Sequence, residues 1–226
     1  MSKFNRQEKI VDTKTINNQH ALIIGIGAVG REVARTIACN GVGKITMFDF
    51  DTVEDHNCVT QGFYHDDIGK SKVECTTEEI LKINPDLQVI SVNDRWRPKH
   101  DKTIVEEHGE FDVMFSCVDS LSMREKLFQF YSDRIKVIFD CRIGGEMIRL
   151  LSVFDEKSKE HYSQTFGEDK DAYADGCHIP MIKHSANLGA SMLVSQYISS
   201  LAGRPLYADR QFLPAINELF SVIEGE

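Results

Sequence analysis

A glycine-rich turn near the N-terminus has the residue types and spacing of a phosphate-binding loop. Residues 25–30 read GIGAVG, directly after the apolar run HALII at 20–24 and before the helical pattern REVARTIACN. In this context Gly25 permits a tight turn, Gly27 admits a phosphate close to the backbone, and Gly30 permits close packing of helix on strand. The N-terminus of the helix adds unpaired N–H groups and a partial positive charge. The pattern predicts a nucleotide site; the alternative is that the glycines serve only the turn.

Asp49 follows the next strand-like run, KITMF at 44–48. It stands 19 residues after Gly30, where a carboxylate can accept hydrogen bonds from the ribose hydroxyls of a nucleotide. The glycine turn and Asp49 together suit NAD as well as ATP. A plain dehydrogenase does not need the polar residues that follow between positions 51 and 72, so this segment favours ATP.

Strand-like and helical patterns alternate around these residues. Strand-like runs fall at 20–24, 44–48, 87–92, 111–116 and 135–139, and helical patterns fall at 29–40, 70–83 and 121–132. Such alternation predicts right-handed βαβ units on a parallel sheet. We therefore expect the α/β class, with a Rossmann-like, mostly parallel sheet, helices on both faces, and a small antiparallel extension at 147–154.

The chain is expected to form a single domain over residues 1–226. Residues 1–19 are its N-terminal arm, and the polar residues 52–69 form a loop. Residues 155–177 lack periodicity and are expected to form a long mobile crossover loop. A final amphipathic helix covers 179–202.

Composition argues against several classes of function. With 26 Lys and Arg against 35 Asp and Glu, the formal charge of −9 argues against sequence-independent binding to nucleic acid or anionic membranes. No run approaches the roughly 18 apolar residues of a membrane span, and residues 1–20 lack the apolar core of a secretory signal. The 6 cysteines form no CxxC pair, so a structural zinc site is not expected. We expect a cytoplasmic protein with reduced thiols and no membrane contact, and the charge counts against a nucleic-acid partner.

Several motifs, in order along the chain, resemble one family. They are GIGAVG at 25–30, GVGKITMFDFDTVE at 41–54 with Asn57 and Gln61 after it, GKSK at 69–72, INP at 83–85, DVMFSCVDS at 112–120, and a final helix led by Cys177. Nearly the whole chain is similar to the ThiF/MoeB/HesA superfamily, the ubiquitin-activating-enzyme-like adenylyltransferases. The resemblance implies one ThiF-type adenylation domain over residues 1–226.

The resemblance also implies which residues bind ATP. The glycine loop would hold the phosphates, and Asp49 matches the ribose-binding carboxylate. Asp51, Asn57 and Gln61 match polar contacts to the nucleotide. Lys72 matches a lysine that neutralises phosphate charge, and a solvated helix lysine is the alternative.

Two further residues match positions that serve the triphosphate. Asp119 matches the aspartate that positions Mg²⁺, although an aspartate at a strand end can instead cap the helix that begins near Leu121. Arg6, in the segment FNRQ, matches an arginine that reaches across a homodimer into the neighbouring triphosphate; the alternative is a frayed terminal arginine. The resemblance thus implies ATP, Mg²⁺ and a homodimer with shared sites.

The chain departs from the family at one phosphate contact. Thr60 stands where the family motif N-x-x-R-Q has its arginine. Loss of that guanidinium would weaken adenylation or abolish it, unless Arg142 supplies the missing charge. The departure leaves open a catalytically impaired scaffold that only binds a nucleotide.

Cys177 is the remaining chemical candidate. It precedes the last helix and matches a cysteine that in some relatives forms a covalent link with the activated carrier. A thiolate at a helix N-terminus has a lowered pKa, and the neighbouring His178 could assist. A buried structural cysteine is the alternative.

The function implied by the resemblance is ATP-dependent adenylation. The substrate would be the C-terminal carboxylate of a ubiquitin-like or sulfur-carrier protein with a Gly-Gly tail, activated as an acyl-adenylate, with or without later transfer to a cysteine. The alternatives are the carboxylate of a small molecule, a peptide or a modified tRNA, the impaired scaffold, and a dehydrogenase. The sequence leaves open which carrier is used, and whether the product serves sulfur transfer or protein conjugation.

Overall fold

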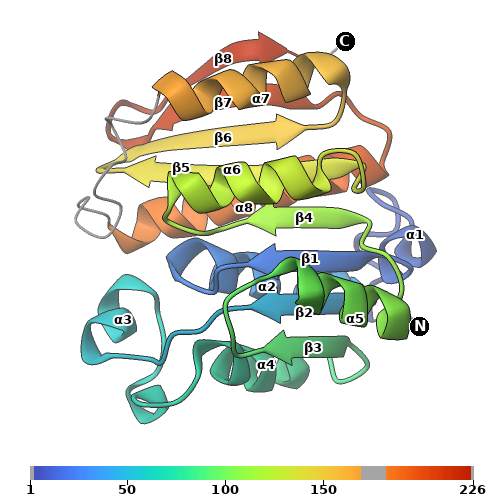
Figure 1. Ribbon diagram of the computed structural model, residues 1–226, viewed down its shortest axis with the longest axis vertical. Helices are drawn as coiled ribbons and strands as arrows, with labels where there is room; N and C mark the ends of the chain where they lie inside the picture. Colours follow the sequence, from blue (N-terminus) through green and yellow to red (C-terminus); the bar gives the residue numbers. More distant parts are fainter. Residues whose placement is uncertain (1–2, 169–181, 225–226) are drawn as a thin grey trace.

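One eight-stranded sheet runs through the computed structural model, which describes residues 3–168 and 182–224 (Figure 1). The strand order is β3-β2-β1-β4-β5-β6-β7-β8. The parallel strands are β1 (His20–Ile24), β2 (Lys44–Phe48), β3 (Gln88–Val92), β4 (Val113–Ser116) and β5 (Val137–Gly144). The antiparallel strands are β6 (Met147–Val153), β7 (Tyr207–Leu213) and β8 (Glu218–Glu224).

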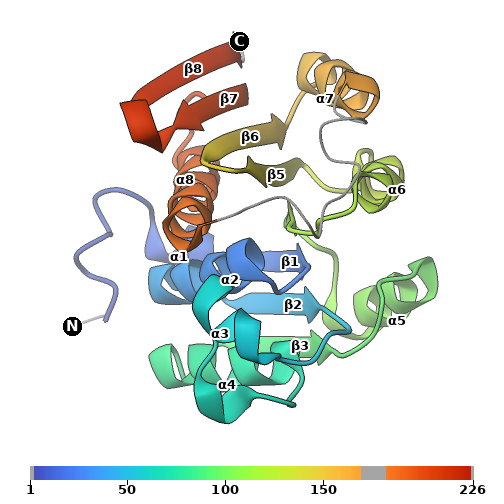
Figure 2. The same cartoon turned by 90° about the vertical axis from the view of Figure 1, so that its left-hand side faces the viewer.

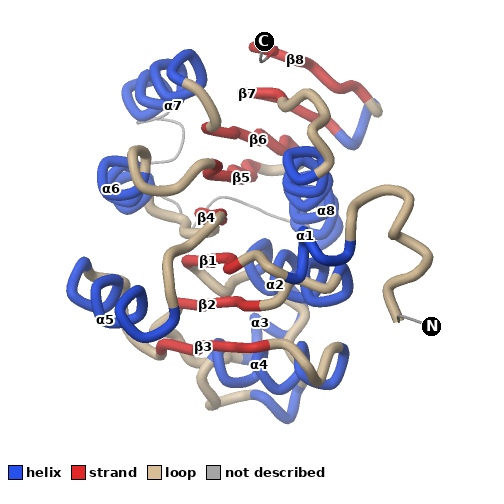
Figure 3. Tube along the Cα trace, turned by 90° about the vertical axis from the view of Figure 1, so that its right-hand side faces the viewer, coloured by secondary structure: helices blue, strands red, loops and turns tan. Residues whose placement is uncertain are grey.

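Helices cover both faces of this sheet (Figure 3). On one face lie α2 (Ala28–Asn40), α4 (Lys72–Ile83) and α8 (Lys183–Leu201). On the other lie α5 (Pro98–His108), α6 (Leu121–Tyr131) and α7 (Glu156–Glu168). Because successive strand residues point to opposite faces, β1 contributes Ile23 to the core beneath α2 and Leu22 to the core beneath α6. Each face of the sheet therefore has its own hydrophobic core.

The strand order changes direction at β1, and this change locates the expected binding site. From β1 the chain proceeds to β2 and β3 on one side, and then returns to place β4 and β5 on the other. In open α/β sheets, ligands bind outside the carboxyl ends of the strands at such a switch point. Figure 2 faces that edge, with α3 (Asp55–Thr60) in front. The N-terminal residues and α1 (Thr13–Asn17) lie at the opposite edge (Figure 1).

The expected fold class is confirmed, and the elements around the glycine turn match expectation closely. β1 and β2 have the predicted bounds, and α2 ends where Gly41 takes a left-handed conformation with φ of 88°. The run expected at 147–154 is β6, which pairs antiparallel with β5. No helix within residues 3–168 or 182–224 is long and apolar enough to cross a membrane.

The prediction of a mobile loop at 155–177 is wrong for residues 156–168. Residues 156–168 form α7, and residues 169–177 lie outside the described residues. The buried side chains of α7 include Ser158, Tyr162 and Thr165. These hydroxyl-bearing residues give the helix an inward face that a hydrophobic pattern does not reveal.

Other elements were missed for similar reasons. In α5 the buried residues are Asp101 and Ile104, so the helix has little apolar periodicity. The polar loop expected at 52–69 contains α3 and a 3₁₀ turn, η1 (His65–Asp67). β7 and β8, with the 3₁₀ turn η3 (Pro214–Ile216) between them, extend the antiparallel part of the sheet beyond the expected strand.

Candidate active site

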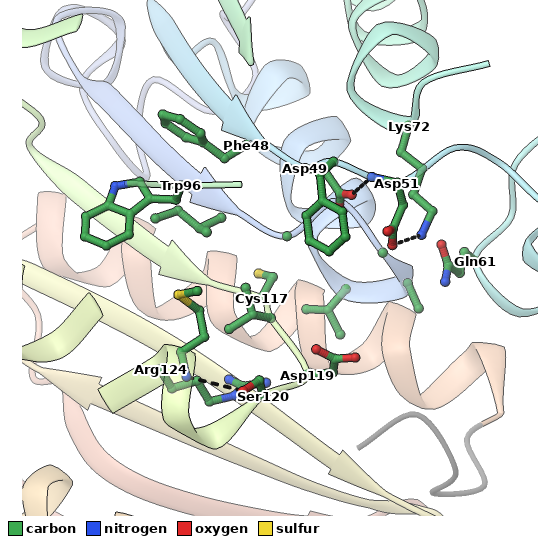
Figure 4. Close-up of a pocket in the computed structure, with 18 of the residues that line it drawn as sticks. Phe48, Asp49, Asp51, Gln61, Lys72, Trp96, Cys117, Asp119, Ser120 and Arg124 are labelled. Atoms are coloured by element: carbon green, nitrogen blue, oxygen red, sulfur yellow. Dashed lines mark hydrogen bonds and ion pairs between the residues drawn. The ribbon is translucent and has the colours of Figure 1, made fainter. Parts of the chain in front are cut away.

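A cavity of about 940 Å³ opens at the carboxyl ends of β1, β2, β4 and β5. Its wall is formed by the glycine turn, the segment from β2 through α3, the β4–α6 turn and the end of β5. Predicted site residues that line it are Gly25, Gly27, Asp49, Asp51, Asn57, Gln61, Lys72 and Asp119. Figure 4 shows Asp49, Asp51 and Lys72 together on one side, with Asp119 and Ser120 on another. The structure therefore brings together residues that lie up to 94 positions apart, from Gly25 to Asp119.

The glycine turn requires glycine at two positions. Gly25 has φ of +91°, and a Cβ there would lie 2.6 Å from the carbonyl oxygen of Cys117. A Cβ on Gly30 would overlap the carbonyl of Gly25, so Gly30 permits the close approach of α2 to the turn. Gly27 is the N-cap of α2 and supplies no capping side chain. Since the first N–H groups of a helix have no intrahelical partner, the start of α2 offers donors to an anion in the cavity.

Asp49 connects the end of β2 to this turn. Its Oδ2 accepts a hydrogen bond from the backbone N–H of Ile26 at 2.6 Å, and its Oδ1 accepts one from Asp51 N–H at 2.8 Å. Burial raises the pKa of the Asp49 carboxyl above its usual value, against the opposing effect of these hydrogen bonds. Asp49 therefore fixes the shape of the glycine turn, and each oxygen keeps a lone pair for a further donor.

Lys72 is buried and paired with Asp51. Its Nζ lies 2.9 Å from Asp51 Oδ2, and the two side chains are 7% and 47% exposed. Lys72 is the first residue of α4, and its backbone N–H donates to Asp51 O. This position at the cavity wall rules out the alternative of a solvated helix lysine.

The short helix α3 is held by its own polar side chains. Asn57 is 2% exposed, and its Oδ1 accepts from the backbone N–H of Glu54 at 2.8 Å, closing a capping box. Gln61 follows the helix with its side chain beside Gly27, and its Oε1 is buried and accepts no hydrogen bond from the described residues. Thr60 Oγ1 donates to His56 O at 2.7 Å. Asn57 thus shapes the loop, whereas Gln61 retains an acceptor for a ligand.

Asp119 stands exposed at the turn between β4 and α6. The N-cap of α6 is Ser120, whose Oγ accepts from Met123 N–H at 3.3 Å. Because Ser120 performs the capping, the alternative of Asp119 as the helix cap is wrong. The Asp119 carboxylate lines the cavity.

Three further residues named from the sequence are Arg6, Arg142 and Cys177. Arg6 is exposed and does not line it, and Gln7 next to it donates to Asn40 O at the far end of α2 from the glycine turn. Arg142 borders the cavity but is 1% exposed, with Nε donating to Asp140 and Nη2 to Thr165, so it does not replace the arginine missing at Thr60. Cys177 lies outside the described residues.

Sequence reasoning missed two features of the cavity wall. Arg124, on the first turns of α6, is 6% exposed, although in the sequence it looks like a surface residue because Glu125 and Lys126 follow it. At the rim, the guanidinium of Arg95 lies 3.8 Å from the ring centre of the half-exposed Phe50. Neither the burial of Arg124 nor the contact of Arg95 with Phe50 is indicated by the residues next to them in the sequence. Within the part of the chain that the structure describes, no group of three or more His, Cys, Asp or Glu could hold a metal ion.

Comparisons with known proteins agree with this geometry. The sequence model of the ThiF family matches residues 4–221. Molybdopterin-synthase adenylyltransferase of Salmonella typhimurium is 28% identical over 175 residues, which cover 74% of this chain and 65% of that protein. Ubiquitin-like modifier-activating enzyme 5 of Dictyostelium discoideum is 30% identical over 125 residues, which cover 51% of this chain and 33% of that protein.

Solved structures share the fold. The crystal structure of Escherichia coli MccB with AMPCPP and MccA has a TM-score of 0.77 at 17% identity, covering 100% of this chain and 72% of that one. The chain spans between 28% and 65% of the length of four curated relatives that it matches.

Proposed function

Because the chain belongs to the ThiF family, we propose that it is an ATP-dependent adenylyltransferase acting on the C-terminal carboxylate of a ubiquitin-like or sulfur-carrier protein. One observation carries the proposal: a single cavity joins the N-terminus of α2, the buried Lys72 and the exposed Asp119. The names of two relatives, an adenylyltransferase of molybdopterin synthase and an activating enzyme of a ubiquitin-like modifier, support both kinds of carrier.

The proposed nucleotide contacts follow from the chemistry of each side chain. The N–H groups at the start of α2 would bind phosphate oxygens, and Lys72 would leave Asp51 in part to pair with them. Asp49 would accept from ribose hydroxyls while keeping the glycine turn in place. Gln61 would accept a hydrogen bond through its Oε1, which has no partner among the described residues and calls for a donor on the nucleotide sugar or on the carrier's backbone.

Asp119 is the proposed protein ligand of Mg²⁺. One carboxylate ligand from the protein suits this ion, which commonly binds one or two carboxylates together with substrate phosphates. When bound, Mg²⁺ neutralises negative charge on the triphosphate. No cluster of further ligands is needed in the described residues for this role.

The proposed reaction joins an oxygen of the carrier's carboxylate to the α-phosphorus of ATP while the bond to the β-phosphate breaks and pyrophosphate leaves. The protein's contribution is to position both reactants and to place positive charge where the leaving group forms. Cys177 is the proposed acceptor of the activated carrier in a later step, in which its thiolate would attack the acyl carbon of the adenylate, a thioester bond would form, and AMP would leave. Replacement of Cys177 by alanine should then abolish transfer and leave pyrophosphate exchange nearly unchanged, whereas retained transfer with a lowered melting temperature would indicate a structural cysteine.

A symmetric homodimer is part of the proposal because Arg6 does not line the cavity of its own chain, and its neighbour Gln7 is bonded to Asn40 at the opposite end of α2 from the glycine turn. Arg6 can serve a triphosphate only in the site of a second copy, where a guanidinium would stabilise charge on the phosphates. An ATP-consuming activity of this kind is expected in the cytoplasm.

A catalytically impaired, nucleotide-binding scaffold is the second candidate. The observation in its favour is that Thr60 offers no cation, while Arg142 is already engaged with Asp140. Such a protein would bind ATP without activating a carboxylate.

ATP–pyrophosphate exchange distinguishes these functions. The purified chain is supplied with Mg²⁺, ATP, labelled pyrophosphate and candidate carriers, each intact or without its last glycine. Exchange that requires the intact tail supports the proposal. Exchange without any carrier contradicts it and indicates a small substrate, and tight ATP binding without exchange indicates the scaffold.

A further inference from the structure

We propose that Asp140 is a positioning residue of the site, which acts through Arg124 to hold the β4–α6 turn that carries Asp119; the inference rests on the adenylation proposed above. Asp140 is fully buried in β5, beside Ser116, the last residue of β4. It does not line the cavity. Its effect on the reaction must therefore pass through other residues.

Arg124 joins the ends of the two strands. Its Nη1 donates to Ser116 O at 3.3 Å and forms an ion pair with Asp140, and its Nη2 donates to Cys141 O at 3.2 Å. Since Arg124 lies near the start of α6, these bonds close a loop that begins at the end of β4, passes through Asp119 and returns to β4. Both terminal nitrogens are engaged within the protein, so the role of Arg124 is to fix the turn.

The orientation of the Asp140 carboxylate is itself fixed from α7. Its Oδ2 accepts from Arg142 Nε and from the hydroxyl of Tyr162, both at 2.9 Å. Burial raises the pKa of Tyr162, which keeps the hydroxyl protonated and donating. Arg142 Nη2 also donates to Thr165 on the same helix, at 3.0 Å. One carboxylate therefore holds two guanidinium groups and connects α7 to the wall of the cavity.

Replacement of Asp140 by asparagine keeps the shape of the side chain and removes its charge. Arg124 then loses its ion pair and keeps only its two carbonyl acceptors. The backbone of the β4–α6 turn, which carries Asp119, should become more mobile. A misplacement of about 1 Å at a catalytic group is sufficient to lower a rate by about a hundredfold. We expect the kcat of ATP–pyrophosphate exchange to fall ten- to hundredfold, with a smaller change in the KM for ATP, because the glycine turn and Lys72 are not part of this network.

The chain offers a matched control in a second buried ion pair. Asp209 is fully buried in β7 and accepts from Arg149 Nη2 at 2.7 Å, and neither residue lines the cavity. Asp209→Asn disturbs the sheet in the same chemical way, away from the site. It should lower the melting temperature about as much as Asp140→Asn and leave kcat within about twofold, in keeping with the independence of distant sites.

The test combines kinetics with hydrogen–deuterium exchange of the full chain. In Asp140→Asn, the amides between Cys117 and Met123 should exchange at least tenfold faster than in the wild type, and in Asp209→Asn they should not. Equal protection of the turn's amides from hydrogen–deuterium exchange in both variants overturns the inference, whether or not the chain catalyses ATP–pyrophosphate exchange. A further outcome is that the wild-type chain catalyses no ATP–pyrophosphate exchange while the turn is loosened in Asp140→Asn as expected. That result would overturn the proposed function and support the structural inference.

Two milder variants keep the test decisive if Asp140→Asn fails to fold. Tyr162→Phe removes a single hydrogen bond to Asp140 and keeps the ring, and it should loosen the same turn by a smaller factor. Arg124→Lys keeps the positive charge but replaces the two terminal nitrogens, which bond Ser116 O and Cys141 O, with a single ammonium. Combined with Tyr162→Phe it should lower kcat by less than the product of the two single effects, because both act through one network. Full additivity, or a turn as protected as in the wild type, overturns the inference.

Discussion

Replacement of Lys72 by methionine is expected to weaken ATP binding strongly and to change stability little. The amine of Lys72 is 2.9 Å from Asp51 Oδ2 and 7% exposed, whereas Asp51 is 47% exposed. Methionine keeps most of the buried stem and removes the charge. Water can then solvate Asp51, so the lost ion pair should cost at most about 1 kcal/mol of unfolding free energy.

The effect on ATP is larger because the phosphates have no replacement for the amine. A charge-assisted hydrogen bond contributes about 1.5–3 kcal/mol. With about 1.4 kcal/mol for each factor of ten, the Kd for ATP–Mg²⁺ should rise by about 10- to 150-fold. Titration calorimetry measures this Kd directly, and thermal unfolding of the same samples measures stability.

Lys70→Met is the matched control. Lys70 lies two residues away, its side chain is 52% exposed, and its nearest acidic partner is Asp67 at 3.8 Å. The Kd of the Lys70→Met variant for ATP–Mg²⁺ should stay within about twofold of the wild-type value, because solvent and salt screen a charge at the surface. The reasoning is refuted if Lys72→Met retains wild-type affinity, if Lys70→Met loses as much, or if the wild type binds NAD more tightly than ATP.

Three further expectations concern protonation, thiols and assembly. Burial lowers the pKa of His20 from 6.5 to about 4, so neutral His20 supports the fold above pH 6.5. At most about 3 kcal/mol of unfolding free energy should be lost as the pH falls toward 4, and denaturant titrations of His20→Gln should lack that loss. Burial raises the pKa of Cys117 to about 12, so brief alkylation at pH 8 followed by mass spectrometry should label the exposed Cys39 and leave Cys117 unmodified. Mixing Arg6→Ala chains with Asp119→Ala chains should restore part of the exchange activity through one intact composite site, and a fully active monomer would contradict shared sites.

The part of the site that the sequence predicts is the part determined by neighbouring residues. Gly25 is needed because of its own φ and the carbonyl of Cys117 next to it, and Asp49 directly follows the strand-like run KITMF. Lys72 follows from the GKSK motif at the start of a helix. In each case the residue type and its place relative to one secondary-structure element carry the prediction.

The part that the sequence does not predict depends on polar contacts between distant elements. Asp140 meets Arg124 across 16 residues and Tyr162 across 22, and no periodicity marks such a network. The sequence predicts a loop where α7 forms for the same reason, since the helix packs with Tyr162 and Thr165 against buried charge as well as against apolar side chains. Hydrophobic patterns describe the cores of this fold well, and they do not describe the polar network beside the cavity.

The charge balance of the cavity links the departure at Thr60 to the proposed homodimer. Lys72 is paired with Asp51, and Arg124 and Arg142 share Asp140, so these three cations face two carboxylates and leave one positive charge in surplus, which is less than the negative charge of a triphosphate. Under the proposed function, the remaining positive charge would come from Mg²⁺ and from Arg6 of a second copy. It follows that Thr60→Arg should make exchange less dependent on Arg6: the loss of activity caused by Arg6→Ala should be several-fold smaller in the Thr60→Arg background. An equal loss in both backgrounds would show that the two positions do not serve the same phosphates.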